Sequence, residues 1–260
     1  MKLVLCQLAP ILGNVEKNLK KMADRISSND GDLYVFPELF MTGYLLRDRI
    51  VHFAMGADSV HIKKVARLAK DNGCDILVGL PMKDRALRGV VRNTALLARR
   101  DGEVLYRHKT YMPNFGPFEE LTYFKQGEVD DVVPWELPWG RLGAIICYEI
   151  FFPELCTRLA RSGADMIVCI SAGPYTSKES FERVIPSRAV ENTVYFAYCN
   201  RVGVEQGMVF HGGSKAVDPR GRTIAECPLF DESVASCQVD LHTVRFARRA
   251  RPTLRDSPLP

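Results

Sequence analysis

RLGAIICYEIFFPE, residues 141–154, joins an apolar run to a turn and then to a proline suited to the start of a helix. The run over 141–147 is short and apolar, as expected for a buried strand. Pro153 fits the first turn of a helix, because the N–H that proline lacks would have no partner there. Helical spacing continues over 153–163, and a second apolar run follows at 165–170. This order of strand, helix and strand predicts an α/β fold.

The same alternation extends along the rest of the chain. Gly73 and Gly163 follow predicted helices as C-caps, and Asp101-Gly102 between two apolar runs predicts a hairpin. No linker, repeat or low-complexity segment divides the sequence, so we expect one domain over residues 1–260, with helices on the outer faces of strand layers. Strands are expected over 2–8, 32–36, 75–80, 93–99, 103–107, 141–147, 165–170, 194–200, 214–218 and 233–240, and helices over 15–27, 58–72, 153–163 and 178–192.

Composition and charge narrow the class of protein. The chain has 260 residues, of which 47% are hydrophobic and 25% are charged, with a net charge of +4. These values are ordinary for a globular domain and exclude disordered or collagen-like chains. Basic residues are concentrated only near the C-terminus, outside any recognisable nucleic-acid module, so we expect a solvated or subunit-contacting tail and no nucleic-acid partner. These residues are Arg245, Arg248, Arg249, Arg251 and Arg255.

Membrane, disulfide and metal chemistry are not expected either. The apolar stretch over residues 1–7 is too short for a signal peptide and lacks a cleavage site, and no apolar run approaches the ~18 residues that span a bilayer. The eight cysteines form no C-x-x-C pair, and the five histidines show no metal-ligand spacing. We therefore expect a cytoplasmic protein with free thiols, no bound metal and no cofactor.

Three predicted strands end in a polar residue that suits catalysis. Glu38, if held in a buried position, is suited to act as a general base, and Lys109 is suited to stabilise an oxyanion. Cys147 stands at a strand-to-helix elbow, which exposes a nucleophile beside backbone N–H groups. A nearby cation and helix N-terminus would favour its thiolate. Taken singly, each residue has a structural alternative: a solvated loop acid, a surface lysine and a buried thiol.

Taken together and in order, these segments resemble the nitrilase superfamily, the carbon–nitrogen hydrolases, over nearly the whole chain. Each motif alone is modestly specific, whereas the complete ordered set is very specific. The motifs are QLAP at 7–10, GNVEKN at 13–18, FPE at 36–38 with TGY at 42–44, YRHK at 106–109, CYE at 147–149 with FPE at 152–154, RAVEN at 188–192, NRVG at 200–203, and GS at 213–214 with DPRG at 218–221.

The resemblance implies a catalytic triad of Glu38, Lys109 and Cys147. In the family's mechanism Cys147 is the nucleophile, and Glu38 is the base that takes its proton and later activates water. Lys109 and the backbone N–H of Tyr148 stabilise the tetrahedral oxyanion. The second acid that is usual in the family corresponds to Glu120, which positions Lys109 and the substrate nitrogen.

Several nearby residues are assigned less directly. Glu119, next to Glu120, is the alternative second acid. Glu149 is interpreted as a surface or helix N-terminal acid with no catalytic role. Tyr148, Phe115 and Tyr175 are candidate substrate-binding residues, although packing explains aromatic residues at least as well. HGGS at 211–214 is interpreted as a turn entering a strand, because the chain has no GxSxG nucleophile elbow for a serine hydrolase.

The family fold implied is a four-layer α-β-β-α sandwich that forms a homodimer or higher homo-oligomer, with the tail at about 243–260 at the subunit interface. The expected reaction is hydrolysis of a small carboxamide through a Cys147 thioester. Nitrile-hydrolysing members commonly have Trp after the nucleophile, whereas this chain has Tyr148. Nitrilase, N-carbamoyl amide hydrolase and free-standing glutaminase activities remain alternatives within the superfamily. A catalytically silent scaffold on the same fold is the alternative of another class.

Overall fold

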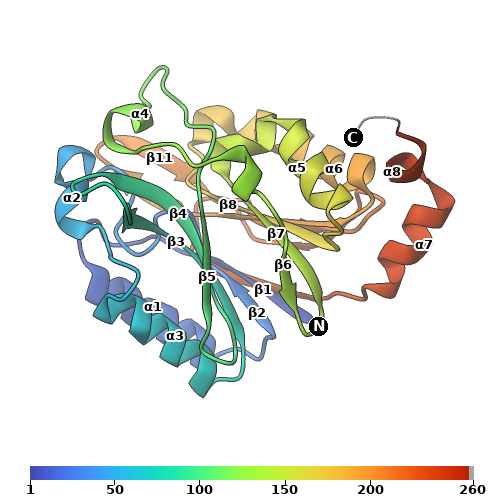
Figure 1. The fold of residues 1–260 in the computed structure, drawn as a ribbon, viewed down its shortest axis with the longest axis horizontal. Coiled ribbons are helices and arrows are strands. Elements are labelled where there is room, and N and C mark those ends of the chain that lie inside the picture. Colours follow the sequence, from blue (N-terminus) through green and yellow to red (C-terminus); the bar gives the residue numbers. More distant parts are fainter. Residues whose placement is uncertain (258–260) are drawn as a thin grey trace.

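Residues 1–257 are described by a computed structural model, in which two six-stranded sheets lie face to face (Figure 1). The strands are β1 (Lys2–Gln7), β2 (Leu33–Val35), β3 (Asp75–Lys83), β4 (Val91–Ala98), β5 (Val104–His108), β6 (Trp135–Leu137), β7 (Gly140–Ile146), β8 (Met166–Ser171), β9 (Tyr195–Asn200), β10 (Val202–Glu205), β11 (Met208–His211), β12 (Lys215–Val217), β13 (Thr223–Glu226) and β14 (Ser233–Gln238). The first sheet has the order β14-β1-β2-β3-β4-β5, the second has the order β13-β12-β9-β8-β7-β6, and β10 pairs with β11 in a separate hairpin.

Helices cover the outer face of each sheet, which completes the predicted four-layer sandwich (Figure 1). Helices α1 and α3 lie on the first sheet, and α5 and α6 lie on the second. The bounds are α1 (Val15–Ser27), α2 (Ile50–Phe53), α3 (Val60–Asp71), α4 (Glu120–Tyr123), α5 (Pro153–Arg161), α6 (Lys178–Asn192), α7 (His242–Ala250) and α8 (Thr253–Asp256), with 3-10 turns η1 (Arg47–Arg49), η2 (Val129–Asp131), η3 (Cys147–Phe151) and η4 (Tyr175–Ser177).

The helices form where the sequence places one apolar face between capping residues. In α1 the side chains of Leu19, Met22 and Ile26 recur three to four positions apart and are buried, and the Asn14 side chain accepts the backbone N–H of Lys17 at the N-terminus. The largest core cluster lies between the sheets and takes apolar side chains from both. It includes Leu3, Leu5, Val35, Leu77, Ala144, Ile146, Val168 and Ile170.

Strand direction brings four strand ends to one end of the sandwich. Strand β2 is parallel to β3, and the two antiparallel pairings β3–β4 and β4–β5 return β5 to the direction of β3. In the second sheet β7, β8 and β9 are parallel. The segments that follow β2, β5, β7 and β8 therefore meet, which is the arrangement that places loop side chains from several strands in one site.

The predicted elements are confirmed where the apolar pattern is strong, and others were missed. Helices 15–27 and 178–192 have the predicted bounds, and β4 and β5 form the hairpin expected at Asp101-Gly102. HGGS at 211–214 links β11 to β12, in agreement with the predicted turn. The short strands β6 and β13, the hairpin β10–β11 and the helix α7 were not predicted. Within residues 1–257, no helix has the length and hydropathy needed to cross a bilayer.

Candidate active site

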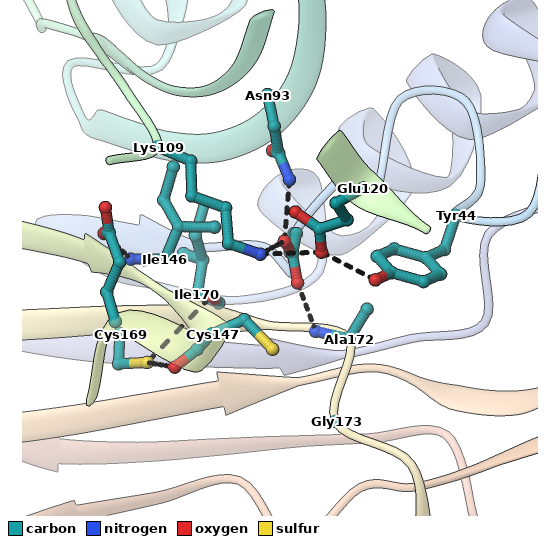
Figure 2. A network of polar contacts seen from close by, with 12 residues as sticks. Tyr44, Asn93, Lys109, Glu120, Ile146, Cys147, Cys169, Ile170, Ala172 and Gly173 are labelled. Carbon is teal, nitrogen blue, oxygen red and sulfur yellow. Dashed lines mark hydrogen bonds and ion pairs between the residues drawn. The ribbon is translucent and has the colours of Figure 1, made fainter. Parts of the chain in front are cut away.

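Glu38, Lys109 and Glu120 come together in a buried cluster, with Cys147 beside it (Figure 2). Glu38 follows β2, Lys109 follows β5, Glu120 begins α4, and Cys147 follows β7. The side chains of Glu38 and Lys109 are wholly buried, and all four residues are at most 6% exposed. Charged groups at this depth are stable only when they are paired, and the contacts below supply the pairing.

Glu38 uses both of its carboxylate oxygens. Oε1 accepts from Lys109 Nζ at 2.6 Å and from Asn93 Nδ2 at 2.7 Å. Oε2 accepts from the backbone N–H of Ala172 at 2.9 Å, in the segment after β8. One carboxylate thus joins β4, the end of β5 and the end of β8, which fixes its position between the two sheets.

The backbone that carries Glu38 depends on a glycine in the neighbouring strand. Gly79 lies in β3, and a Cβ added there would overlap the backbone of Glu38 and Leu39. Leu39 itself has a φ of 49°, in the left-handed region, which is strained for a residue with a side chain. The close approach of β3 to this turn is therefore possible because position 79 has no side chain.

Glu120 is the second acid of the cluster. Its Oε1 accepts from Lys109 Nζ at 2.8 Å and from the Tyr44 hydroxyl at 2.6 Å (Figure 2). Its Oε2 is buried and has no hydrogen-bond partner among residues 1–257. Glu119 is exposed and accepts only from the Tyr123 hydroxyl at 3.4 Å. Of the two acids considered from the sequence, the structure brings Glu120 to Lys109.

Opposing effects set the charges in the cluster. For Lys109, burial lowers the pKa, but the carboxylates of Glu120 and Glu38 raise it by more, so the amine stays an ammonium. For Glu120, burial raises the pKa, the Lys109 ammonium lowers it and Glu38 raises it again, and the result is a pKa of about 7. Because these groups interact strongly, they titrate as a cluster.

Cys147 stands at a sharp elbow between β7 and η3. Its φ is 50°, in the left-handed region, and strain of this kind at a non-glycine residue is typical of functional sites. Figure 2 shows its side chain in the space between Lys109 and Ala172. Cys147 is the first residue of η3 and Tyr148 the second, so the Tyr148 N–H belongs to the first turn, whose N–H groups have no partner within the helix.

The protonation state of Cys147 differs from the one expected from the sequence. Burial raises the pKa of the thiol, Glu38 raises it further, and the nearby Lys109 lowers it by less. The expectation that the elbow would favour a thiolate is therefore wrong, because the site is closed to water and holds a carboxylate as well as an ammonium. The thiol is neutral in the free protein and needs a base before it can react.

Of the two interpretations of Glu149, the helix N-terminal acid is confirmed, since Glu149 lies in the first turn of η3, and the surface acid is wrong. Glu149 is wholly buried and forms a two-pronged ion pair with Arg107, at 2.7 Å and 2.6 Å. Arg107 lies in β5, two positions before Lys109, which follows the strand, and an extended backbone directs both side chains to the same face. This period-two spacing was the one signal in the sequence that Arg107 is directed inward. His108, on the opposite face, contacts Thr94 Oγ1 at 2.8 Å, and burial lowers its pKa to about 4.

The three candidate substrate-binding residues do not form one group. Phe115 is 54% exposed, and its ring centre lies 5.5 Å from that of Tyr148, so these two lie together beside the nucleophile. Tyr175 is also 54% exposed but packs against Phe230, with ring centres 5.5 Å apart. The neighbouring Tyr111 stacks on Phe152, with ring centres 3.9 Å apart.

Two cavities adjoin this end of the sandwich. One is small, about 30 Å³, and is lined by Glu120, Tyr44 and Phe118 among others. The other is about 390 Å³ and is lined by Tyr175, Pro174 and Met208 among others. Both contain Arg47 in their walls. The larger volume is in the range that holds a small organic ligand. Among residues 1–257, no three His, Cys, Asp or Glu side chains converge as a metal site would require.

Three groups outside the triad contact the acids of the cluster but were not assigned a role from the sequence. Asn93, Tyr44 and the Ala172 N–H contact the acids directly. Asn93 lies within the apolar strand β4, where a buried amide needs a polar partner. That was the available signal for Asn93, whereas the backbone N–H of Ala172 has no signature in a sequence.

Comparisons with known proteins give a consistent answer. The carbon-nitrogen hydrolase family model matches residues 2–249. Glutamine-dependent NAD(+) synthetase of Thermotoga maritima is 34% identical over 93% of this chain, which spans only 42% of the synthetase. Saccharomyces cerevisiae Nit3, a member of branch 10 of the nitrilase superfamily, has a TM-score of 0.88 at 26% identity, over 97% of this chain and 94% of that one. An amidase from Nesterenkonia sp. AN1, solved after Michael addition of acrylamide at its active-site cysteine, has a TM-score of 0.77 at 29% identity, over 96% and 97% of the two chains.

Proposed function

The chain belongs to the carbon–nitrogen hydrolase family, and from this premise we propose that it hydrolyses a small carboxamide to the carboxylic acid and ammonia or an amine. The observation that carries the proposal is the position of Cys147, at a strained elbow beside an ammonium that bridges two carboxylates. This arrangement supplies a nucleophile, a base and a cation for a developing oxyanion within one buried site.

The reaction begins with the neutral thiol. Glu38 takes the proton of Cys147 while the sulfur attacks the amide carbon, and the C=O π electrons move to oxygen. Lys109 Nζ and the Tyr148 N–H stabilise that oxyanion. Collapse of the tetrahedral intermediate breaks the C–N bond, and Glu38 gives its proton to the leaving nitrogen. The products of this half-reaction are a thioester on Cys147 and ammonia or an amine.

Water completes the cycle. Glu38 takes a proton from water, and the resulting hydroxyl attacks the thioester carbon, again with the oxyanion held by Lys109 and the Tyr148 N–H. The C–S bond then breaks, the acid leaves, and the proton on Glu38 returns to the sulfur of Cys147. Glu120 keeps Lys109 in place during both halves through the 2.8 Å contact.

The free oxygen of Glu120 favours an amide over a nitrile. Its Oε2 is buried without a partner and the residue lines a cavity, and an unpaired buried acceptor is costly. An amide nitrogen carries N–H donors that satisfy this oxygen, whereas a nitrile has none. Two relatives support the same choice, because one is named an amidase and the other depends on glutamine, which is itself a carboxamide.

The test is ammonia release from a panel of small primary amides, L-glutamine, N-carbamoyl amines and nitriles. We expect turnover of at least one amide by the wild type, none by Cys147→Ala, and normal turnover by the control Cys237→Ala, whose half-buried thiol lies in β14. Turnover of nitriles alone would contradict the proposed amidase activity and indicate a nitrilase. Residual hydrolysis by Cys147→Ala at the wild-type rate would refute the nucleophile.

The proposal also includes the cellular compartment and the oligomeric state of the protein. All eight cysteines are free and seven of them are buried, which supports function in a reducing cytoplasm. We also propose that the chain acts as a homo-oligomer with its C-terminal tail at the interface. Residues 258–260 of that tail lie outside the described residues.

A further inference from the structure

We propose that Glu149 is a positioning residue of the active site, whose carboxylate fixes the Cys147 elbow to the Lys109 segment so that nucleophile and oxyanion cation keep their relative placement. The inference rests on the proposed function, because it assigns a role within that reaction. It starts from a carboxylate that is wholly buried between the two sheets. The Glu149 carboxylate does not contact the other acids of the cluster, Glu38 and Glu120, and all of its own partners flank Cys147 or Lys109.

On the nucleophile side, Glu149 forms hydrogen bonds with the backbone before and after Cys147. Its Oε2 accepts the backbone N–H of Ile146, the residue before Cys147, at 2.6 Å. Its own carbonyl accepts the N–H of Phe152 at 3.1 Å. Cys147, with its left-handed φ, thus lies between Ile146 and Phe152, whose backbone N–H groups both donate to Glu149. Contacts of this kind maintain a strained backbone.

On the lysine side, the same carboxylate holds Thr110, which follows Lys109, directly, and it reaches His108, which precedes Lys109, through Arg107. Oε1 accepts the Thr110 backbone N–H at 2.5 Å and the Thr110 hydroxyl at 2.6 Å. Arg107, paired with Glu149, also donates from Nη2 to the carbonyl of His108 at 2.9 Å and from Nη1 to that of Ala144, in β7, at 2.8 Å. The backbone on either side of Lys109 is therefore tied to the elbow through one side chain.

The contacts of Glu149 depend on its being a carboxylate, with two accepting oxygens, and not only on the size of the side chain. Each of its oxygens accepts from Arg107 and from at least one backbone N–H. Burial raises its pKa, but Arg107 and Thr110 lower it by more, so the group is a carboxylate at neutral pH. In Glu149→Gln the new amide N–H₂ must face either Arg107 and Ile146 or Arg107 and Thr110. In either orientation the amide N–H₂ faces N–H donors and cannot accept from them. The link between the Cys147 elbow and the Lys109 segment is therefore weakened.

A matched control exists elsewhere in the fold. Asp75, at the start of β3, is also wholly buried and accepts from the backbone N–H and side chain of Arg100 and from Trp139 Nε1. It lies at the first residue of β3, four positions before Gly79, where the turn that carries Glu38 crosses the strand. Asp75→Asn therefore disturbs an arginine–carboxylate pair with an equally buried carboxylate, although Arg100 is partly exposed, without touching the active site.

The experiment compares wild type, Glu149→Gln and Asp75→Asn in kcat, KM, melting temperature and the rate at which iodoacetamide alkylates Cys147 as a function of pH. A misplacement of about 1 Å costs on the order of 10²-fold in rate, so we expect Glu149→Gln to lower kcat about 100-fold with KM within about threefold. We also expect a change in the pH profile of Cys147 alkylation. For Asp75→Asn we expect a similar decrease in melting temperature, whereas kcat and the alkylation profile should equal those of the wild type.

The inference is overturned if Glu149→Gln keeps wild-type kcat and alkylation, or if the two variants lose activity in proportion to their loss of stability. The alkylation readout needs no substrate, so it still decides the role of Glu149 if no amide is turned over and the proposed function fails. If Glu149→Gln does not fold, Thr110→Val removes one of the donors and leaves the others. We then expect a roughly 3- to 10-fold fall in kcat, and unchanged kcat and alkylation would refute the inference.

Discussion

The Cys147 thiol is held in its protonated form by burial and by the same carboxylate that we propose as its base. Burial and the Glu38 carboxylate both raise the pKa of the thiol, so the nucleophile is formed by proton transfer during the reaction. The buried site sets two carboxylates, Glu38 and Glu120, against the one ammonium of Lys109, and this explains why the thiolate is not favoured at rest although Lys109 is near.

Glu38→Gln separates the two effects of this carboxylate. Loss of the base should lower turnover about 10²- to 10⁴-fold. Loss of its negative charge should lower the pKa of Cys147, so alkylation by iodoacetamide at neutral pH should not fall with turnover. Steady-state kinetics and alkylation rates between about pH 6 and 10 measure both. Parallel loss of turnover and alkylation would contradict the role of Glu38 as the base.

The acidic limb of the pH–activity profile should report the cluster that contains Glu120. Its pKa is about 7, and its carboxylate form is the one that holds Lys109 and that we propose accepts the substrate N–H. We therefore expect kcat/KM to fall as the pH drops below about 7. The Tyr44 hydroxyl lowers the pKa of Glu120, so Tyr44→Phe should move this limb to higher pH. A limb that stays in place, or moves to lower pH, would show that Tyr44 does not act on the titrating group.

At the scale of the elements, the contact between β3 and the turn after β2 determines where Glu38 lies. Strand β3 pairs with β2 in parallel register, and Gly79 is the point at which the turn crosses it closely. The acid is thus located by the shape of two backbones before any side-chain contact is made.

Gly79→Ala should disrupt this crossing. The added methyl group overlaps the backbone of Glu38 and Leu39, and overpacking of this kind costs about 1–3 kcal/mol or more. We expect a lower melting temperature and a loss of kcat together. The control is Gly73→Ala: Gly73 has open space around it and, unlike Gly79, a positive φ of 62°, so about 1–2 kcal/mol of strain is expected with normal kcat. Normal kcat in Gly79→Ala would contradict the account of the turn.

Sequence patterns found the elements whose burial is uniform along their length. The strands β7 and β8 are almost wholly buried and read as apolar runs, and α1 has a single apolar face. The edge strand β13 is largely exposed and only four residues long, so it carries no such pattern. Helix α7 has five polar or charged residues among its nine and buries only Val244 and Ala247, which hides its period.

Only the part of the site that follows from strand ends and from the family resemblance could be predicted from the sequence. Glu38, Lys109 and Cys147 follow apolar strands, and the fold places strand ends together. The partner of Glu149 could not be predicted, because pairing between Arg107 and residue 149 depends on how two sheets face each other. The protonation of Cys147 was also inaccessible, since burial and net local charge are properties of the assembled site.

At the scale of the whole molecule, the C-terminal segment lies apart from the catalytic end. Helices α7 and α8 lie at the far side of the sandwich from α2 and α4 (Figure 1). Helix α7 contacts the domain through Arg248, which donates to the carbonyl of Ala164 at 2.6 Å, while Phe246 is 65% exposed. A phenylalanine exposed to this extent on a tail helix is suited to contact a second subunit.

The wild type should therefore be a dimer or larger oligomer by light scattering, and Phe246→Lys should shift it toward the monomer. The reason is that a charge placed in an apolar contact must lose its hydration without a partner. Leu121→Lys, at an exposed position in α4, is the control and should keep the wild-type mass. A monomeric wild type, or an unchanged mass in Phe246→Lys, would contradict an interface at this helix.

The central claim is covalent catalysis by Cys147, and intact-protein mass after rapid quenching with a turned-over amide tests it most directly. The wild type should gain the mass of the acyl group without the leaving amine, the adduct should map to the peptide that contains Cys147, and Cys147→Ala should gain nothing. Release of ammonia by the wild type with no adduct at any quench time, or an adduct on another residue that persists in Cys147→Ala, would contradict the account.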